Sequence, residues 1–236
     1  MNQFVRTKIL LGQKNMELLK NSSIIIFGIG GVGSYVTEAL ARCGINNLTL
    51  VDNDNISESN INRQICANID TIGLPKVQVM KQRILKINPD AKITTINEFV
   101  TEANVFDILN KNFTYAVDAI DTISSKIQII LAADKLNLPI ISCMGTGNKI
   151  NPLLLKLDDI YKTNYCPLAK VMRRELKKRG IKKLRVCYST EPPKKIINPT
   201  PNEKLISSIS FVPSAAGLII ASDIVKNIIA AQPYSQ

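Results

Sequence analysis

Residues 23–33, Ser-Ile-Ile-Ile-Phe-Gly-Ile-Gly-Gly-Val-Gly, decide the fold of this chain. The apolar run Ile24 to Phe27 has the length of one strand buried in a parallel sheet, and a glycine-rich turn follows it. Apolar residues with helical spacing then extend from Val32 to Cys43, and a second apolar run, Leu48 to Val51, ends in acids. A strand, a glycine turn, a helix and a parallel strand with acids at its tip form a mononucleotide-binding βαβ unit.

The turn and the tip of the second strand hold the residues expected to touch the nucleotide. The glycines are Gly28, Gly30, Gly31 and Gly33, and the acids are Asp52 and Asp54. Because glycine has no Cβ, the backbone N–H groups of the turn can approach a phosphate closely. The two carboxylates follow the second strand, where the ribose hydroxyls of a nucleotide lie in this kind of unit.

The residues that follow favour ATP over a dinucleotide. The glycine spacing alone also occurs in dehydrogenases and is weak evidence. A hydride-transferring enzyme has no use for Arg63 and Lys76, whereas an enzyme that handles a triphosphate needs such cations to neutralise it. The alternative is that both are surface charges on a basic protein.

The composition indicates an α/β protein that works without imidazole. The chain has 236 residues, 45% of them hydrophobic, and no histidine, which excludes imidazole general bases and Ser–His or Cys–His pairs. Its five cysteines are widely spaced and odd in number, as expected for reduced thiols in the cytoplasm. Without a Cys-x-x-Cys pair or a histidine, no zinc site is expected. Residues 1–12 are mixed polar and basic, so no signal peptide is expected.

Positive charge is concentrated in one segment. The chain carries 30 Lys and Arg against 19 Asp and Glu, and between Lys162 and Arg185 only Glu175 opposes the basic residues. A one-sided field of this kind attracts polyanions, usually nucleic acid. The candidate phosphate contacts are Lys170, Arg173, Arg174, Lys177 and Lys178. The alternative is a solvated helix surface.

Two cysteines flank this basic segment. Cys166 and Cys187 are therefore the thiols that we would test for reactivity, whereas Cys43 and Cys143 suit burial best. A thiol-acceptor role for Cys66 stays open on the sequence alone.

The rest of the chain alternates between strand and helix patterns. Helices are predicted over residues 4–19, 75–88, 104–109, 124–136 and 167–179, and strands over 93–100, 115–121, 140–144, 151–157 and 184–188. Residues 57–70 and the proline-rich residues 191–204 read as loops, the second of them exposed and mobile. We expect a Rossmann-like, doubly wound, mostly parallel α/β sheet with helices on both faces over residues 1–150. A basic substrate-binding segment and a final helix over residues 151–236 are expected to pack on the same domain.

The final helix, predicted over residues 213–231, is apolar. Residues 205–222 carry no charge and are nearly numerous enough to cross a membrane. Pro213, Gly217 and several serines favour a core or dimer helix instead, with peripheral membrane association as the alternative.

Five ordered motifs resemble the ThiF/MoeB/HesA superfamily of ATP-dependent adenylating enzymes, relatives of the activators of ubiquitin-like proteins. They are Gly28 to Gly33, Asp52-Asn53-Asp54, Ser59 to Gln64, Gly73-Leu74-Pro75-Lys76 and Asp118-Ala119-Ile120-Asp121. Within the superfamily, Cys166-Pro167-Leu168-Ala169-Lys170 with the basic helix, and Tyr188-Ser189-Thr190-Glu191, resemble the branch that dehydrates threonylcarbamoyladenosine in tRNA. The resemblance spans the chain from Arg6 to the final helix.

The resemblance implies roles for the matching residues. Arg63, Lys76 and Asp121 are implied to be catalytic, with Asp121 beside an ATP-bound Mg²⁺; the alternative for Asp121 is a helix N-cap. The implied ATP contacts are Gly28, Gly30, Gly31, Gly33, Asp52, Asp54, Ser59, Asn60, Asn62, Arg63, Gln64, Lys76, Asp121, Thr122 and Arg6. Asp52 has the alternative of only supporting the turn. Arg6 is implied to reach the partner subunit's ATP site in a homodimer, with Lys8 as its rival.

The activity implied is ATP-dependent adenylation and cyclisation of threonylcarbamoyladenosine in tRNA, with tRNA and not DNA as the partner. Cysteine desulfurases or sulfur-acceptor proteins are further implied partners. One alternative is an activator of a ubiquitin-like or sulfur-carrier protein, although such relatives generally carry Cys-x-x-Cys zinc ligands that this chain lacks. The other alternative is a catalytically silent, nucleotide-gated scaffold that binds RNA or protein.

Overall fold

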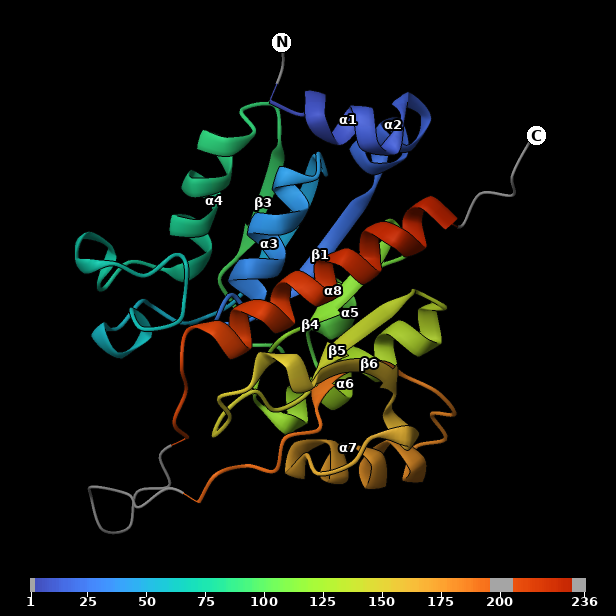
Figure 1. The fold of residues 1–236 in the computed structure, drawn as a ribbon. Coiled ribbons are helices and arrows are strands. Elements are labelled where there is room, and N and C mark those ends of the chain that lie inside the picture. The colour runs from blue at the N-terminus through green and yellow to red at the C-terminus, as the bar shows by residue number, and fades with distance from the viewer. Residues whose placement is uncertain (1–2, 196–205, 231–236) are drawn as a thin grey trace.

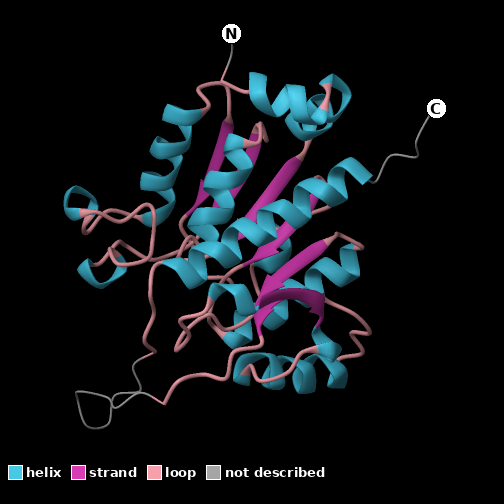
Figure 2. Cartoon of the chain, in the orientation of Figure 1, coloured by secondary structure: helices cyan, strands magenta, loops and turns pink. Residues whose placement is uncertain are grey.

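The computed structural model describes residues 3–195 and 206–230. Its described strands form one seven-stranded sheet in the order β3-β2-β1-β4-β5-β7-β6, parallel except for the pair β6 and β7. The strands are β1 Ser23–Phe27, β2 Asn47–Val51, β3 Lys92–Ile96, β4 Tyr115–Asp118, β5 Ile140–Cys143, β6 Leu155–Asp159 and β7 Arg185–Ser189. Figure 2 shows the helices arranged around this sheet.

Eight α-helices and four short 3₁₀-helices lie in the described residues. The α-helices are α1 Val5–Leu11, α2 Gln13–Asn21, α3 Gly33–Arg42, α4 Lys76–Ile87, α5 Val105–Ile108, α6 Ile123–Leu136, α7 Pro167–Lys178 and α8 Phe211–Ala230. The 3₁₀-helices are η1 Glu58–Asn60, η2 Ile69–Thr71, η3 Pro152–Leu154 and η4 Ile160–Lys162.

The central strand β1 is buried on both faces. Alternate side chains of a strand point to opposite sides, and Ile24 and Ile26 belong to the core that contains residues of α3, α4 and α8. Ile25 and Phe27 belong to the core beneath α5 and α6. Helices therefore cover both faces of a mostly parallel sheet, as Figure 1 shows. The predicted doubly wound fold is confirmed.

The helix α8 is packed in the protein core and is not an isolated apolar helix. Val212, Ala216 and Ile220 are buried against α3 and the sheet. A Cβ on Gly217 would lie 2.6 Å from the carbonyl oxygen of Val32, so the two helix backbones approach closely at this glycine. By length and composition α8 could cross a membrane, yet 56% of its apolar window is buried inside the protein.

The structure differs from the sequence predictions in five places. The strand predicted over 115–121 ends at Asp118, where β4 ends. Gly12, with φ of 82°, divides the single predicted N-terminal helix into α1 and α2. The strand β3 ends at Ile96 because its neighbour β2 ends at Val51, opposite it. The strand predicted over 151–157 begins as η3, since the Asn151 side chain accepts from the Leu153 N–H. The loop predicted over 57–70 contains η1 and η2, and most of the loop predicted over 191–204 lies outside the described residues.

Candidate active site

The glycine turn lies between the end of β1 and the start of α3, at the carboxyl edge of the sheet. Gly28 has φ of 87°, and a Cβ there would lie 2.8 Å from the carbonyl carbon of Ala119. A Cβ on Gly33 would lie 1.7 Å from the carbonyl oxygen of Gly28. The backbone therefore permits only glycine at both positions. At Gly30 an added Cβ would meet only the Gln64 amide nitrogen, at 3.8 Å, so this part of the turn is open.

Asp52 supports the turn. Its Oδ2 accepts from the Ile29 N–H at 2.6 Å and its Oδ1 from the Asp54 N–H at 2.9 Å. Burial raises the pKa of Asp52, while Lys76 and the two N–H donors act in the opposite direction. Both carboxylate oxygens of Asp52 thus accept hydrogen bonds from the backbone.

Asp54 and Lys76 form an ion pair at the tip of β2. The Lys76 Nζ lies 2.6 Å from Oδ2 of Asp54. The lysine side chain is 7% exposed, whereas that of the aspartate is 60% exposed. Lys76 starts α4, and its N–H donates to the Asp54 carbonyl oxygen at 3.1 Å. The ammonium is consequently fixed under an accessible carboxylate.

The loop that carries Arg63 is built on a capping box. The Ser57 N–H donates to Oδ1 of the buried Asn60, so this asparagine serves the loop itself. The half-buried Arg63 donates from Nη1 to the Ser59 carbonyl oxygen at 2.8 Å and to Oδ1 of Asn62 at 2.9 Å. The other guanidinium nitrogens of Arg63 have no hydrogen-bond partner among the described residues. They are therefore available to bind an anion.

Gln64 presents an unsatisfied acceptor next to the glycine turn. The residue is 6% exposed, and its Oε1 is buried without a hydrogen-bond partner among the described residues. A buried polar atom without a partner is costly. A hydroxyl or amino group of a nucleotide is a donor of the kind that this oxygen lacks.

Asp121 is exposed just beyond the end of β4, on the same edge of the sheet. It is not the N-cap of α6, a position held by Thr122, whose side chain makes no capping bond. Within the described residues the Asp121 carboxylate has no hydrogen bond or ion pair, and no group of three potential metal ligands exists. One free carboxylate fits Mg²⁺ only if phosphates and water supply the other oxygens, which is the usual way that nucleotide-bound Mg²⁺ is held.

A buried ion pair lies directly behind Asp121. Lys126 of α6 and Asp118 of β4 are both 0% exposed, with Nζ and Oδ2 2.9 Å apart. Complete burial raises the pKa of Asp118, and Lys126 and the Ser142 hydroxyl act against this rise. Sequence reasoning placed Asp118 at this edge but missed Lys126. The sequence does contain a signal for its burial, because Lys126 shares a helical face with the apolar residues Ile130 and Ala133.

A short segment before α8 connects the Arg63 loop to the turn after β5. The Asn62 amide donates to the Ser208 carbonyl oxygen at 3.1 Å. The Ser207 N–H and hydroxyl both donate to Oδ1 of Asn148 at 2.9 Å. A Cβ on Gly147 would lie 2.3 Å from a methyl carbon of Ile206. Asn62, predicted to contact phosphate, is thus joined to both Arg63 and this segment.

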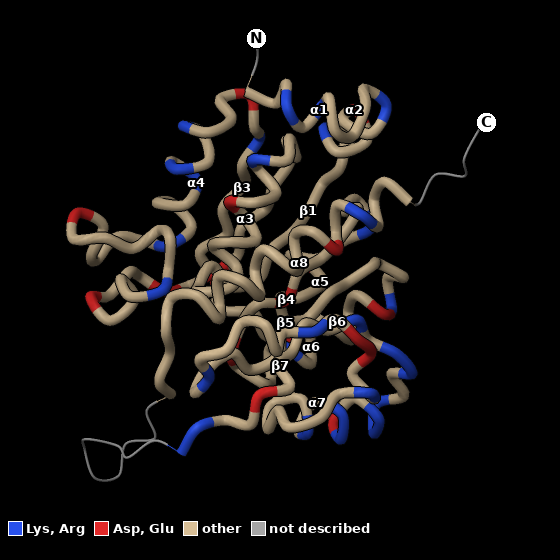
Figure 3. Tube along the Cα trace, in the orientation of Figure 1, with Lys and Arg blue, Asp and Glu red and all other residues tan. Residues whose placement is uncertain are grey.

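The basic residues of α7 divide into bound and unpaired groups, and Figure 3 shows them along the helix and the loop after it. Arg173 is half-buried and donates to the Thr163 carbonyl oxygen at 2.9 Å. Glu175 pairs with Arg174 and Lys178 of the candidate set, and also with Arg179, and these contacts lower its pKa to about 2. Among the described residues, Lys170 and Lys177 are exposed and have no ion-pair partner.

Two further features lie at the opposite edge of the sheet. Arg6 is exposed on α1, which with α2 precedes the amino end of β1, so this chain does not bring Arg6 to its own glycine turn.

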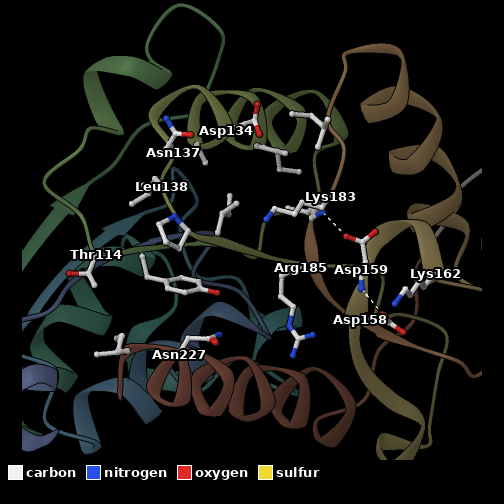
Figure 4. A pocket seen from close by; sticks show the side chains of 18 residues that line it. Thr114, Asp134, Asn137, Leu138, Asp158, Asp159, Lys162, Lys183, Arg185 and Asn227 are labelled. Carbon is white, nitrogen blue, oxygen red and sulfur yellow. Dashed lines mark hydrogen bonds between the residues drawn. The ribbon is translucent and has the colours of Figure 1, made fainter. Parts of the chain in front are cut away.

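A cavity of about 1000 Å³ lies where β4, β5 and β7 begin, with Tyr115, Lys183 and Arg185 in its wall (Figure 4). It is remote from the glycine turn and from Asp121.

The cysteines are free thiols, mostly inside the protein. Cys66, Cys143, Cys166 and Cys187 are buried, and Cys43 is half-buried rather than fully buried. Burial raises the pKa of Cys66 to about 11, and a hydrogen bond with Cys143 together with burial raises the pKa of Cys187. Cys166 and Cys187 are therefore less accessible than their place beside the basic segment indicated.

The glycine turn, the two acids after β2, the Arg63 loop and Asp121 share one edge of the sheet, in the sequence order of an adenylating enzyme. Residues 4–235 match the ThiF family. The chain belongs to the ThiF family. Residues predicted from the family motifs, Arg63, Lys76 and Asp121, all lie on this edge.

Within the ThiF family, several proteins similar to this chain share one activity in their names. The chain is 39% identical over 242 residues to the tRNA threonylcarbamoyladenosine dehydratase of Bacillus subtilis, covering 97% of this chain and 95% of that protein. The structure of the Escherichia coli tRNA N6-threonylcarbamoyladenosine dehydratase TcdA with AMP superposes with a TM-score of 0.90 at 34% identity, covering 97% of this chain and 94% of that chain. The complex of the same enzyme with ATP gives 0.89 at 33%, with the same coverage.

Proposed function

We propose that this protein is an ATP-dependent tRNA threonylcarbamoyladenosine dehydratase. The observation that carries the proposal is the shared edge of the sheet, where the open glycine turn, the Asp54–Lys76 pair and the Asp121 carboxylate face the same side. The full-length similarity to dehydratases supports it, as do the ATP and AMP complexes of the E. coli enzyme.

The reaction requires positioning and charge neutralisation more than a nucleophile of the enzyme. The carboxylate of the threonyl group attacks the α-phosphorus of ATP, and pyrophosphate leaves. The neighbouring carbamoyl group then closes a ring on the activated carbonyl carbon and expels AMP, so that the nucleoside loses the elements of one water. Ring closure within one molecule is favoured by its high effective concentration, which agrees with a chain that has no histidine.

Each residue of the edge has a proposed part in the adenylation step. The turn around Gly30 and Gly31 binds phosphate through backbone N–H groups, and Asp54 accepts from the ribose hydroxyls. Arg63 and Lys76 neutralise the phosphate chain as pyrophosphate leaves. Asp121 is the residue that would hold Mg²⁺, and the ion, when bound, would screen the charge of the phosphates.

The helix α7 is the proposed tRNA surface. Its first residue follows Cys166, whose sulfur lies 3.5 Å from the position of a Cβ on Gly145, just beyond β5. The helix thus begins near the carboxyl edge of the sheet and presents Lys170 and Lys177 to solvent, with Arg174 and Lys178 beside Glu175. Arg173 supports the fold through Thr163. We expect this surface to bind the phosphates of tRNA rather than its bases.

We further propose a cytoplasmic homodimer in which Arg6 completes the ATP site of the partner subunit. Arg6 is exposed and lies far from its own glycine turn, and Ile9 and Leu10 beside it are 80% and 81% exposed. Mixing inactive Arg6→Ala and Asp121→Ala subunits should restore about a quarter of the activity, because half the dimers then contain one complete site. A mixture without activity would mean that Arg6 does not serve the partner subunit's site. The buried thiols offer no support for sulfur transfer to a partner.

The test of the activity is release of AMP and pyrophosphate from Mg·ATP with tRNA that carries threonylcarbamoyladenosine. Mass spectrometry of the nucleoside should show a product lighter by one water, and tRNA without the modification should give no turnover. ATP–pyrophosphate exchange that instead requires a protein ending in Gly-Gly would identify an activator of a carrier protein. No turnover with either substrate would identify a silent scaffold.

A further inference from the structure

We propose that Lys126 is a positioning residue, whose buried ammonium sets the place of Asp121. The inference rests on the function proposed above, in which Asp121 takes part in adenylation. Lys126 itself cannot touch a nucleotide, because its side chain is 0% exposed. Its influence on the site passes through the backbone.

The ammonium of Lys126 joins the ends of two neighbouring strands. It lies 2.9 Å from Oδ2 of Asp118, the last residue of β4. It donates to the carbonyl oxygen of Cys143, the last residue of β5, at 2.8 Å, and to that of Ile120 at 3.0 Å. An ammonium has three N–H groups, so these acceptors use its full donor capacity.

The residue that Lys126 holds is the one next to Asp121. The segment 119–122 has no helix or strand, and two of its anchors come from this cluster. The Ile120 N–H donates to Oδ1 of Asp118 at 3.3 Å, and the Ile120 carbonyl oxygen accepts from Lys126. The Asp121 side chain has no partner among the described residues, so the position of its carboxylate depends on how its backbone is held.

Stability alone does not account for a charge at this place. Removing two charges from water is costly, and buried ion pairs can often be replaced by uncharged groups at little cost. The Ser142 hydroxyl donates to Oδ2 of Asp118 at 2.6 Å, and the Ile120 N–H donates to Oδ1. Both oxygens of this carboxylate therefore accept hydrogen bonds. A cluster in which every donor and acceptor is used specifies one geometry, and this geometry fixes the loop of Asp121.

The decisive variant removes the charge of both partners. Lys126→Met/Asp118→Asn is neutral and close in volume, so neither partner is left as an uncompensated buried charge. We expect kcat for AMP formation to fall about 100-fold, the effect of a small misplacement of a reacting group. KM for ATP should change less than about threefold, because most of the proposed nucleotide contacts follow β1 and β2 and are not held by Lys126.

The control makes the same kind of change elsewhere. Arg83 donates to Oε2 of Glu38 at 2.7 Å, and this carboxylate is 8% exposed between α3 and α4. Glu38→Gln/Arg83→Met should lower the melting temperature and leave kcat unchanged. An equal loss of kcat in both double variants would mean that destabilisation, and not the position of Asp121, causes the effect.

A mutant cycle with Asp121→Asn tests whether Lys126 acts through Asp121. In the Asp121→Asn background, the Lys126→Met/Asp118→Asn change should lower the remaining kcat by no more than about twofold, since coupled residues are not additive. A full 100-fold further loss, or an unchanged kcat in the wild-type background, would overturn the proposal.

A measurement without substrate separates this proposal from the proposed function. Amide hydrogen exchange in residues 119–123 should become faster in Lys126→Met/Asp118→Asn, while exchange in α3 and α4 stays as in the wild type. If the wild type had no turnover with modified tRNA but exchange in residues 119–123 still increased in the double variant, the proposed function would be wrong. The positioning of this loop by Lys126 would nevertheless be supported. Unchanged exchange in the double variant would show that Lys126 does not fix the position of this loop.

Discussion

Lys76 Nζ lies 2.6 Å from Oδ2 of Asp54, and the lysine is buried beneath the aspartate. The pair joins the start of α4 to the tip of β2. Two residues that the sequence placed separately, one for phosphate and one for ribose, are thus one structural unit. Changing either should affect the other.

The first prediction concerns this unit. Lys76→Met should lower kcat for AMP formation by at least about 100-fold, because one preorganised positive group is lost where charge develops. Asp54→Asn should raise KM for ATP and also destabilise the fold, since it leaves a buried ammonium without its counter-charge. Steady-state kinetics and thermal melting measure both effects. Lys86→Met, on the exposed part of α4, is the matched control and should behave as the wild type.

The second prediction compares two glycines of the turn. Gly33→Ala should lower the melting temperature, because its methyl group would lie 1.7 Å from the Gly28 carbonyl oxygen and force the turn to shift. Gly30→Ala meets only a side-chain nitrogen at 3.8 Å and should melt as the wild type while binding ATP more weakly. Differential scanning fluorimetry with and without ATP distinguishes them. Equal melting temperatures for the two variants would contradict the geometry of the turn.

The third prediction is a loss of stability in alkali. Burial raises the pKa of Cys66 from 9.0 to about 11, so folding favours the protonated thiol. The resulting stability is complete below pH 9 and is lost as the pH rises toward 11, by about 2–3 kcal/mol in total. Chemical unfolding at pH 8 and pH 10.5 measures it. Cys66→Ala should show a smaller decrease between the two pH values, and an identical decrease would exclude Cys66 as a cause.

The fourth prediction concerns the binding of tRNA. Lys170→Ala/Lys177→Ala should weaken binding and reduce the slope of log K against log salt by about 1 to 2, the effect of one or two lost phosphate contacts. Lys86→Ala/Lys92→Ala removes the same charge from the region of α4 and β3 and should lower the slope much less. Filter binding over a range of salt concentrations provides both slopes. Identical slopes for the two variants would mean that α7 acts only through overall charge.

The sequence allowed the sheet and most of the site to be predicted because their signals are local. The turn from Gly28 to Gly33 and the acids after Val51 follow one another within one βαβ unit. What could not be predicted depends on contacts between distant residues. Asn62 meets Ser208, 146 positions away, and no periodicity shows such a pair. The burial of Lys126 was missed for the same reason, since its three acceptors come from two strands and a loop.

The helix α8 ties together regions that lie at opposite ends of the sheet. Its first turn packs Pro213 against the glycine turn, 3.2 Å from the position of a Cβ on Gly31, and α8 also contacts α2. The 20 residues of α8 span about 30 Å. One helix therefore packs against both the phosphate-binding turn and the N-terminal helix α2, so a single element fixes the distance between the two regions.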